Sequence, residues 1–209
     1  KSTLAKAIIN IQKPSNGEIY FNKNNLMNLN KDQTIKMRQD VQMIFQDPYS
    51  SLNPKSTIRK LLIEPLKFHK ITNKANYEKK IVELIFKVGL DNKFLDKYPH
   101  QLSGGQCQRV NIARALSVNP KILIADEPTS SLDVTIQAQI IELIINLCKK
   151  MELTLIFISH ALRVVKNICN KIIVMKGGKI IESGSTYEVF HKTKNTYTKE
   201  LITSVLSIN

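Results

Sequence analysis

Two adjacent carboxylates, Asp126 and Glu127, stand directly after a short unbroken apolar run at residues 122–125. A run of this length and composition is typical of a strand buried on both faces of a parallel sheet. In open α/β sheets, ligands bind in a crevice at the carboxyl ends of the strands. The pattern therefore predicts a ligand site with one carboxylate for a metal ion and one for a water molecule.

A second candidate site begins at Ser103, which is followed by two glycines and then by residues at helical spacing: Val110, Ala113, Arg114 and Leu116. A serine and two glycines ahead of a helix form an anion site, because the free backbone N–H groups and the helix dipole point the same way. A phosphate-seeking loop combined with a carboxylate pair implies that the ligand is a nucleotide.

The two segments resemble motifs of one family. LSGGQ at residues 102–106 and ILIADEPTSSLD at residues 122–133 resemble the signature motif and the Walker B motif with its D-loop of the ATP-binding cassette (ABC) ATPases. The non-functional alternative, a glycine turn before a helix and a strand that ends in acids, leaves the order and separation of the motifs unexplained. The resemblance implies an α/β fold, with a P-loop NTPase core of mainly parallel sheet flanked by helices and an α-helical subdomain.

The same resemblance implies roles for individual residues, with ATP and Mg²⁺ as cofactors. Asp126 would hold Mg²⁺ together with Ser2 and Gln46, and Glu127 would polarise the attacking water. His160, after the strand expected at residues 153–158, would be the catalytic switch histidine. The implied nucleotide-binding residues are Lys1, Ser2, Thr3, Gln46, Ser103, Gly104, Gly105, Gln106 and Asp133. Ala161 departs from the family, where many members have aspartate.

Lys1-Ser2-Thr3 matches the end of a P-loop, in which glycines cradle phosphates, lysine reaches the terminal phosphates and a hydroxyl binds Mg²⁺. A helical pattern follows, with apolar residues at Leu4, Ala7, Ile8 and Ile11. The glycines of a complete P-loop are not in front of Lys1. We therefore expect an N-terminally truncated cassette that lacks the first strands of the family.

Three further segments resemble a narrower group, the ATPase subunits of oligopeptide, dipeptide and nickel importers: FQDPYSSLNP (45–54), YPHQ (98–101) and NTYTKEL (195–201). This resemblance implies transmembrane permease subunits and a second ABC ATPase subunit, identical or homologous, as partners. It also implies an extracytoplasmic solute-binding protein as an indirect partner and no nucleic-acid partner. The expected location is peripheral, on the cytoplasmic face of the inner (plasma) membrane.

Local patterns predict the elements that position these residues. The helix at 77–88 has apolar residues on one face and Gly89 as its C-terminal cap. Asp133 suits the N-cap of a helix at 134–150, and a Gly-Gly turn at 177–178 predicts a hairpin. The other expected elements are a turn into a strand at 15–21, a polar surface loop at 22–30, a strand at 41–45, a signature helix ending near Ser117, a second buried strand at 153–158, and a turn at 183–186 entering a short helix at 187–190.

We expect one partial ABC ATPase domain over residues 1–209. Residues 1–50 and 118–209 would form the RecA-like core, and residues 51–117 the helical subdomain with the signature motif. A chain of 209 residues that is 43% apolar can bury such a core. The net charge of +14 comes from lysines spread along the whole chain, so it does not by itself indicate nucleic acid. Three cysteines without a C-x-x-C pair fit a reduced compartment.

These observations favour the ATP-hydrolysing subunit of an ABC importer for peptides or a similar small solute. One alternative is a soluble ABC-type ATPase that acts on nucleic acid or ribosomes; it is disfavoured because one cassette is seen and no heptad array. The other alternative is an inactive truncated remnant.

Overall fold

The computed structural model describes residues 1–206. The chain divides into two compact units, Ser2–Ile156 and Lys1 with Phe157–Asn209, and each is described by itself. The boundaries expected at residues 50/51 and 117/118 do not coincide with this division and stay a prediction. Among the described residues, no helix combines the length and the apolar character that a bilayer crossing requires.

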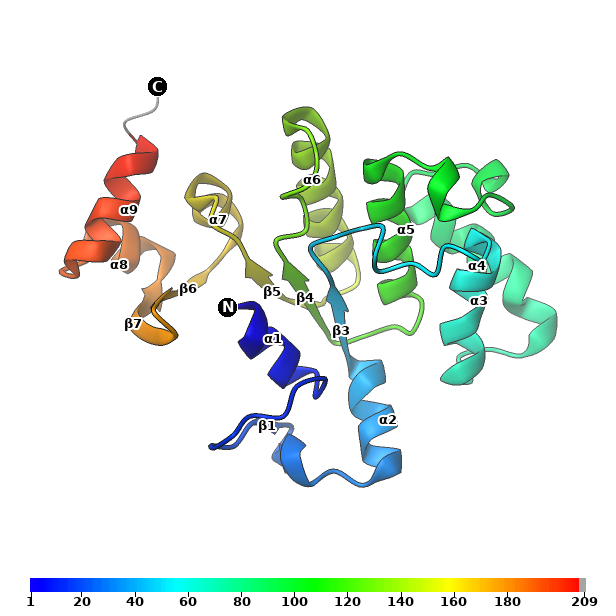
Figure 1. Cartoon of the computed structure of the whole chain (residues 1–209), viewed down its shortest axis with the longest axis horizontal. Coiled ribbons are helices and arrows are strands. Elements are labelled where there is room, and N and C mark those ends of the chain that lie inside the picture. The colour runs from blue at the N-terminus through cyan, green and yellow to red at the C-terminus, as the bar shows by residue number, and fades with distance from the viewer. Residues whose placement is uncertain (207–209) are drawn as a thin grey trace. The chain divides into compact units, whose positions relative to one another are not determined.

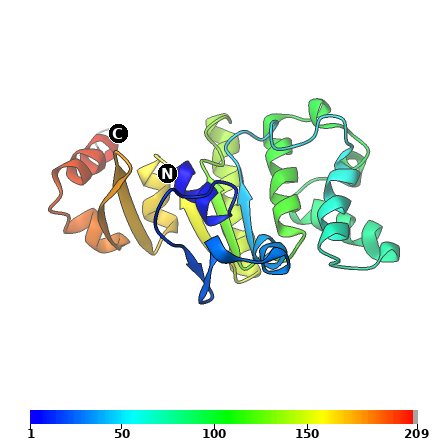
Figure 2. The ribbon, with the colours of Figure 1, turned by 60° about the horizontal axis from the view of Figure 1, so that its bottom comes forward.

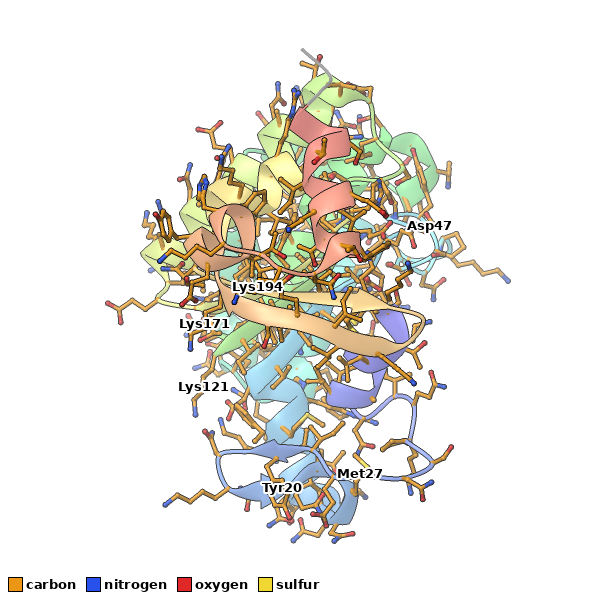
Figure 3. The ribbon with its side chains drawn as sticks, turned by 90° about the vertical axis from the view of Figure 1, so that its left-hand side faces the viewer. Tyr20, Met27, Asp47, Lys121, Lys171 and Lys194 are labelled. Atoms are coloured by element: carbon orange, nitrogen blue, oxygen red, sulfur yellow. The ribbon has the colours of Figure 1, made fainter. Side chains whose placement is uncertain are left out.

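The larger unit is built on a sheet in which β4 (Ile122–Asp126) lies between β3 (Val41–Ile44) and β5 (Thr154–Ile158). β3 and β4 are parallel, and Ile44 stands opposite Ala125. The residues that follow the two strands therefore emerge at the same edge of the sheet. Asp47, which follows β3, and Lys121, which precedes β4, lie on opposite sides of the view in Figure 3, with Asp47 higher.

Helices cover both faces of this sheet (Figure 2). α1 (Ser2–Ile8) buries Ala5 and Ala7 and contacts β4 on one face. α6 (Val134–Lys150) crosses the other face and places Ile140 and Ile144 in the same apolar cluster as Leu123 of β4. The helix predicted at 134–150 is confirmed, and the helix predicted after Lys1 ends at Ile8.

Three helices gather beside β3: α3 (Ile58–Phe68), α4 (Tyr77–Lys87) and α5 (Gly104–Leu116) (Figure 1). Single 3₁₀ turns at Lys74–Asn76, Asn92–Phe94 and Pro99–Gln101 connect them. Their facing sides form one buried cluster, whose fully buried members include Ile58, Leu62, Leu66, Ile81, Ile85, Ile112 and Leu116. The amphipathic helix and its glycine cap are confirmed, since Gly89 has a φ of +72°.

The segment before β3 differs from the expectation. The turn into a strand expected at 15–21 ends in a strand of two residues, β1 (Tyr20–Phe21), which pairs with β2 (Asn24–Asn25) in a hairpin. A 3₁₀ turn, Leu26–Asn28, follows, and α2 (Lys31–Asp40) leads into β3. The polar surface loop expected at 22–30 is confirmed in part: most of its residues are exposed or half-buried, but it contains β2 and the 3₁₀ turn, and Leu26 is 1% exposed.

β5 is a strand as predicted, but the prediction that it is buried is wrong. Its first residue is exposed and the next four are half-buried. Within the described residues, β5 pairs with β4 on one side and stands at the end of its sheet. An end strand with one paired edge buries less side-chain surface than the central β4.

The smaller unit contains α7 (Leu162–Ile168), the hairpin β6 (Lys171–Lys176) and β7 (Lys179–Ser185), α8 (Thr186–His191) and α9 (Thr196–Leu206). Its core consists of Val165, Ile172 and Val189, with Phe157 and Phe190 packed against them. The Gly-Gly hairpin is confirmed, with φ values of +56° and +78° at Gly177 and Gly178. The turn expected at 183–186 is wrong, because β7 continues to Ser185, whose side chain caps α8.

Candidate nucleotide site

The carboxyl end of β4 meets the start of α1. Asp126 is the last residue of β4 and is 4% exposed, while Ser2 is the first residue of α1. The Ser2 hydroxyl donates to Asp126 Oδ1 at 3.1 Å. The structure thus places a hydroxyl oxygen and a buried carboxylate, both predicted as metal ligands, side by side.

A second contact joins the segments after β3 and β4. The amide Nε2 of Gln46 donates to Glu127 Oε2 at 3.4 Å. Since the amide nitrogen makes this contact, the amide oxygen of Gln46 is the atom available to a metal or a water. The parallel pairing of Ile44 with Ala125 explains why the two side chains meet, because each follows its strand by one or two residues.

Glu127 has a backbone conformation that is uncommon for a residue with a Cβ. Its φ is +45°, in the left-handed region. The backbone N–H and the hydroxyl of Ser130 both donate to the Glu127 carbonyl, each at 3.2 Å. Such backbone strain persists only where surrounding contacts hold it, and it is enriched at functional sites.

The donor set fits Mg²⁺. Ser2, Asp126 and Gln46 offer a hydroxyl, a carboxylate and an amide oxygen, which are hard oxygen donors. Within residues 1–206, no three His, Cys, Asp or Glu side chains group in a way that could hold a metal ion. Mg²⁺ typically binds through one or two carboxylates and takes its remaining ligands from phosphates and water.

Two predicted residues, Lys1 and His160, belong to the smaller unit. Lys1 Nζ donates to the Ser159 carbonyl at 3.4 Å. His160 follows Ser159 and is exposed, and the Ser159 hydroxyl accepts from the Ala161 N–H at 2.9 Å. Thr3 is exposed on α1, in the larger unit. The roles of Lys1, Thr3 and His160 stay predictions.

The signature segment forms a capping box at the start of α5. Ser103 is the N-cap, its hydroxyl accepts from the Gln106 N–H at 3.4 Å, and its own N–H donates to Gln106 Oε1 at 3.0 Å. The side chains of Ser103 and Gln106 thus bond to the helix end, and their contact with nucleotide stays a prediction.

The two signature glycines lie against the segment after β4. A Cβ on Gly104 would be 3.1 Å from Leu132 Cδ2, and a Cβ on Gly105 would be 2.6 Å from Ile136 Cγ2. Asp133 lies between these neighbours and is the N-cap of α6, with Oδ1 accepting from the Ile136 N–H at 3.1 Å. The prediction that Asp133 is an N-cap is confirmed. The close packing also explains, without any contact to a second subunit, why positions 104 and 105 are glycines.

Sequence reasoning missed a set of buried polar residues on α5. Gln108 and Asn111 are 0% and 4% exposed, and Arg114 donates to the Ser51 carbonyl at 2.7 Å. Burial lowers the pKa of the Arg114 guanidinium, and Glu64 opposes that change. The available signal was three polar residues at a spacing of three on a helix whose other residues are mostly apolar or small.

Comparison with known proteins identifies the family. The family model described as "ABC transporter" matches residues 1–130. The oligopeptide transport ATP-binding protein OppF of Haemophilus influenzae is 47% identical over 206 residues, which are 98% of this chain and 62% of that protein. The oligopeptide transport ATP-binding protein AppF of Bacillus subtilis is 43% identical over 206 residues, which are 98% of this chain and 63% of that protein. The chain thus spans about three fifths of the length of these relatives.

A solved structure agrees with the sequence comparison. The dimeric, post-hydrolysis structure of the ATP-binding cassette MJ0796, bound to ADP and Pi, superposes with a TM-score of 0.78 at 31% identity. The match covers 88% of this chain and 80% of that chain. The predicted α/β cassette fold is therefore confirmed, and this chain belongs to the ABC transporter family.

Proposed function

We propose that this chain is the ATP-binding and ATP-hydrolysing part of an importer subunit that powers uptake of oligopeptides, dipeptides or a similar small solute. The observation that carries the proposal is the convergence at the ends of β3 and β4: Ser2 with Asp126, and Gln46 with Glu127. The names of the oligopeptide transport relatives support the choice of solute.

In this proposal each side chain has a defined task. Ser2, Asp126 and Gln46 hold Mg²⁺, which supplies positive charge against the phosphates of ATP. Glu127 accepts a hydrogen bond from the attacking water and orients it toward the terminal phosphate. Lys1 and Thr3 bind phosphate, and His160 contacts the terminal phosphate.

The proposed working unit is a pair of ATPase subunits, identical or homologous. Ser103, Gly104, Gly105 and Gln106 of one subunit, with Asp133, would meet ATP held by the other subunit. The N-cap position of Ser103 supports this role, because the N–H groups of a helix start favour an anion. The dimeric state of MJ0796 with ADP and Pi is a further support.

The transport partners follow from the same proposal. Residues 51–117 form a helical subdomain that docks on transmembrane permease subunits, and residues 1–50 and 118–209 form the core. The subunit then works at the cytoplasmic face of the inner membrane, and an extracytoplasmic solute-binding protein delivers the solute. The packing of α3, α4 and α5 against one another, with Ile58, Ile81 and Ile112 each 0% exposed, supports a helical subdomain.

The test is Glu127→Gln in the complete protein. We expect ATP turnover to fall by about 10²-fold or more, because the water loses its general base, while ATP affinity stays within about twofold. Glu142→Gln, on the exposed side of α6, is the matched control and should keep full turnover. Unchanged turnover in Glu127→Gln would refute the assignment.

A further inference from the structure

Two buried amides lie one turn apart on α5. Gln108 is 0% exposed and Asn111 is 4% exposed. Residues three apart on a helix lie on the same side, and Asn111 Nδ2 donates to Gln108 Oε1 at 3.4 Å. The two side chains therefore form a contiguous polar pair inside an otherwise apolar cluster.

Each amide also anchors one of the loops that carry the candidate site. Gln108 Nε2 donates to the Pro128 carbonyl at 2.6 Å, and Pro128 directly follows Glu127. Asn111 Nδ2 donates to the Pro48 carbonyl at 2.9 Å, and Pro48 stands two residues after Gln46. A chain of hydrogen bonds thus runs from one loop to the other behind the Gln46–Glu127 contact.

In the part of the chain that the structure describes, the amide of Asn111 donates two hydrogen bonds through its nitrogen and accepts none through its oxygen. Within the described residues, Asn111 Oδ1 is buried and accepts no hydrogen bond. A buried acceptor without a partner costs free energy, and an apolar side chain of similar size would avoid that cost. A leucine at position 111 would have no N–H group to donate to the Pro48 carbonyl and to Gln108 Oε1.

We propose that Gln108 and Asn111 are a pair of positioning residues that set the spacing between Gln46 and Glu127. The pair makes the two loops move together, so that the carboxylate and the amide keep one separation. The catalytic consequence rests on the proposed ATP hydrolysis, whereas the mechanical coupling of the loops does not. An experiment on the loops can therefore refute the coupling without refuting ATP hydrolysis, and a test of ATP hydrolysis leaves the coupling open to its own test.

The coupling is tested by hydrogen exchange in the complete protein carrying Asn111→Leu. This change removes the donor to Pro48 and keeps the branched shape and the number of heavy atoms of the side chain. Exchange should become about fivefold faster in residues 46–52 and also in residues 127–133, which Asn111 reaches through Gln108. Faster exchange in residues 46–52 alone would overturn the proposal, because the loops would then be anchored independently.

Ser117→Ala is the matched control. Ser117 is also buried on α5, but its hydroxyl donates to the Arg114 carbonyl in its own helix at 2.6 Å. Exchange in both loops should keep its wild-type rate in this variant. An equal rise in Ser117→Ala would show that any disturbance of α5 loosens the loops, and the specific pair would be refuted.

The reverse experiment uses Gln108→Met, which cuts the anchor to Pro128 and keeps the side-chain length. We expect faster exchange in residues 46–52 as well, so this variant decides the question if Asn111→Leu does not fold. In the double variant Asn111→Leu/Gln108→Met, the rates should equal those of the more affected single variant, because the pair acts as a unit. Additive effects would contradict that.

ATP turnover provides the functional arm. In Asn111→Leu we expect kcat to fall about tenfold with KM within about twofold, because the groups that act in the transition state are displaced while nucleotide contacts remain. The melting temperature should stay within a few degrees of the wild type. Unchanged kcat in a folded variant refutes the positioning role; a wild type that does not hydrolyse ATP refutes the proposed function instead, and the exchange experiment still decides the coupling.

Discussion

Ser2 Oγ lies 3.1 Å from Asp126 Oδ1, although 124 positions separate the two residues in the sequence. The contact joins the first turn of α1 to the last residue of β4. Because neither element contains both groups, the pair exists only when α1 is packed on the sheet. The proposed Mg²⁺ site therefore depends on the integrity of that packing.

The first prediction concerns this pair. Ser2→Ala removes the hydroxyl, and we expect the Mg²⁺-dependent part of ATP affinity to fall roughly 10- to 100-fold, as is typical when a group supporting a metal is lost. Titration calorimetry with Mg²⁺ and with a chelator measures it. Ser2→Thr retains a hydroxyl and should bind as the wild type does. Equal losses with and without Mg²⁺ would contradict a metal role.

The second prediction concerns the close approach of Gly105 to α6. A Cβ at position 105 would lie 2.6 Å from Ile136 Cγ2, which is closer than real contacts allow. Gly105→Ala should lower the free energy of unfolding by about 1–3 kcal/mol, the usual cost of overpacking. Urea unfolding measures this change. In an Ile136→Ala background the obstructing atom is absent, so the cost of Gly105→Ala should largely disappear; a full cost there would disprove the steric explanation.

The third prediction concerns pH and His69, the residue that ends α3. Burial, and secondarily Lys36, lower the pKa of His69 below its ordinary value of 6.5. The unfolded chain therefore takes up the proton at a higher pH than the folded chain does. The stabilisation is complete above about pH 6.5 and decreases as the pH falls toward the folded pKa.

His69→Gln should flatten this part of the stability curve. We expect the melting temperature of the wild type to fall more than that of the variant between pH 7.5 and pH 5.5. Lys36→Met removes the secondary cause and should move the His69 pKa upward, which a proton NMR titration can follow. Parallel curves for the wild type and His69→Gln would show that His69 does not contribute to the pH dependence.

The fourth prediction concerns thiol reactivity. Burial raises the pKa of Cys107 to about 11 and that of Cys148 to about 11, and both side chains are buried. Cys169 is half-buried, and burial raises the pKa of its thiol as well, so its greater exposure is what distinguishes it from the other two. Since the thiolate is the reactive form, a maleimide at pH 7.5 should label Cys169 first and the other two only when the fold opens. Mass spectrometry of Cys169→Ser should then show no fast labelling; fast labelling of Cys107 would contradict its burial.

Local sequence patterns predicted the elements that carry the motifs. The sequence predicts α4, α5 and α6 because their apolar residues recur at helical spacing, and because Gly89 and Asp133 suit caps of α4 and α6. The Gly177-Gly178 hairpin was recognised because both positions need positive φ. Helical spacing, caps and tight turns each depend on only a few neighbouring residues, so they can be predicted without knowing the fold.

Local sequence patterns do not predict α3 or the burial of Leu26. α3 contains Pro65 within the helix, which local rules disfavour. It forms nonetheless because Ile58, Leu62 and Leu66 are each 0% exposed in the cluster with α4 and α5. Leu26 is buried within a polar segment for the same kind of reason. In both cases tertiary burial outweighs the local preference.

The amino-acid sequence by itself determined the motifs, their order and the chemistry of the groups they carry. Tertiary structure decided which of those groups meet: Gln46 with Glu127, and both loops with the amides of Gln108 and Asn111. The physical reason is that a hydrogen bond between distant segments depends on distances of a few ångströms, and packing of whole elements, not local periodicity, sets those distances.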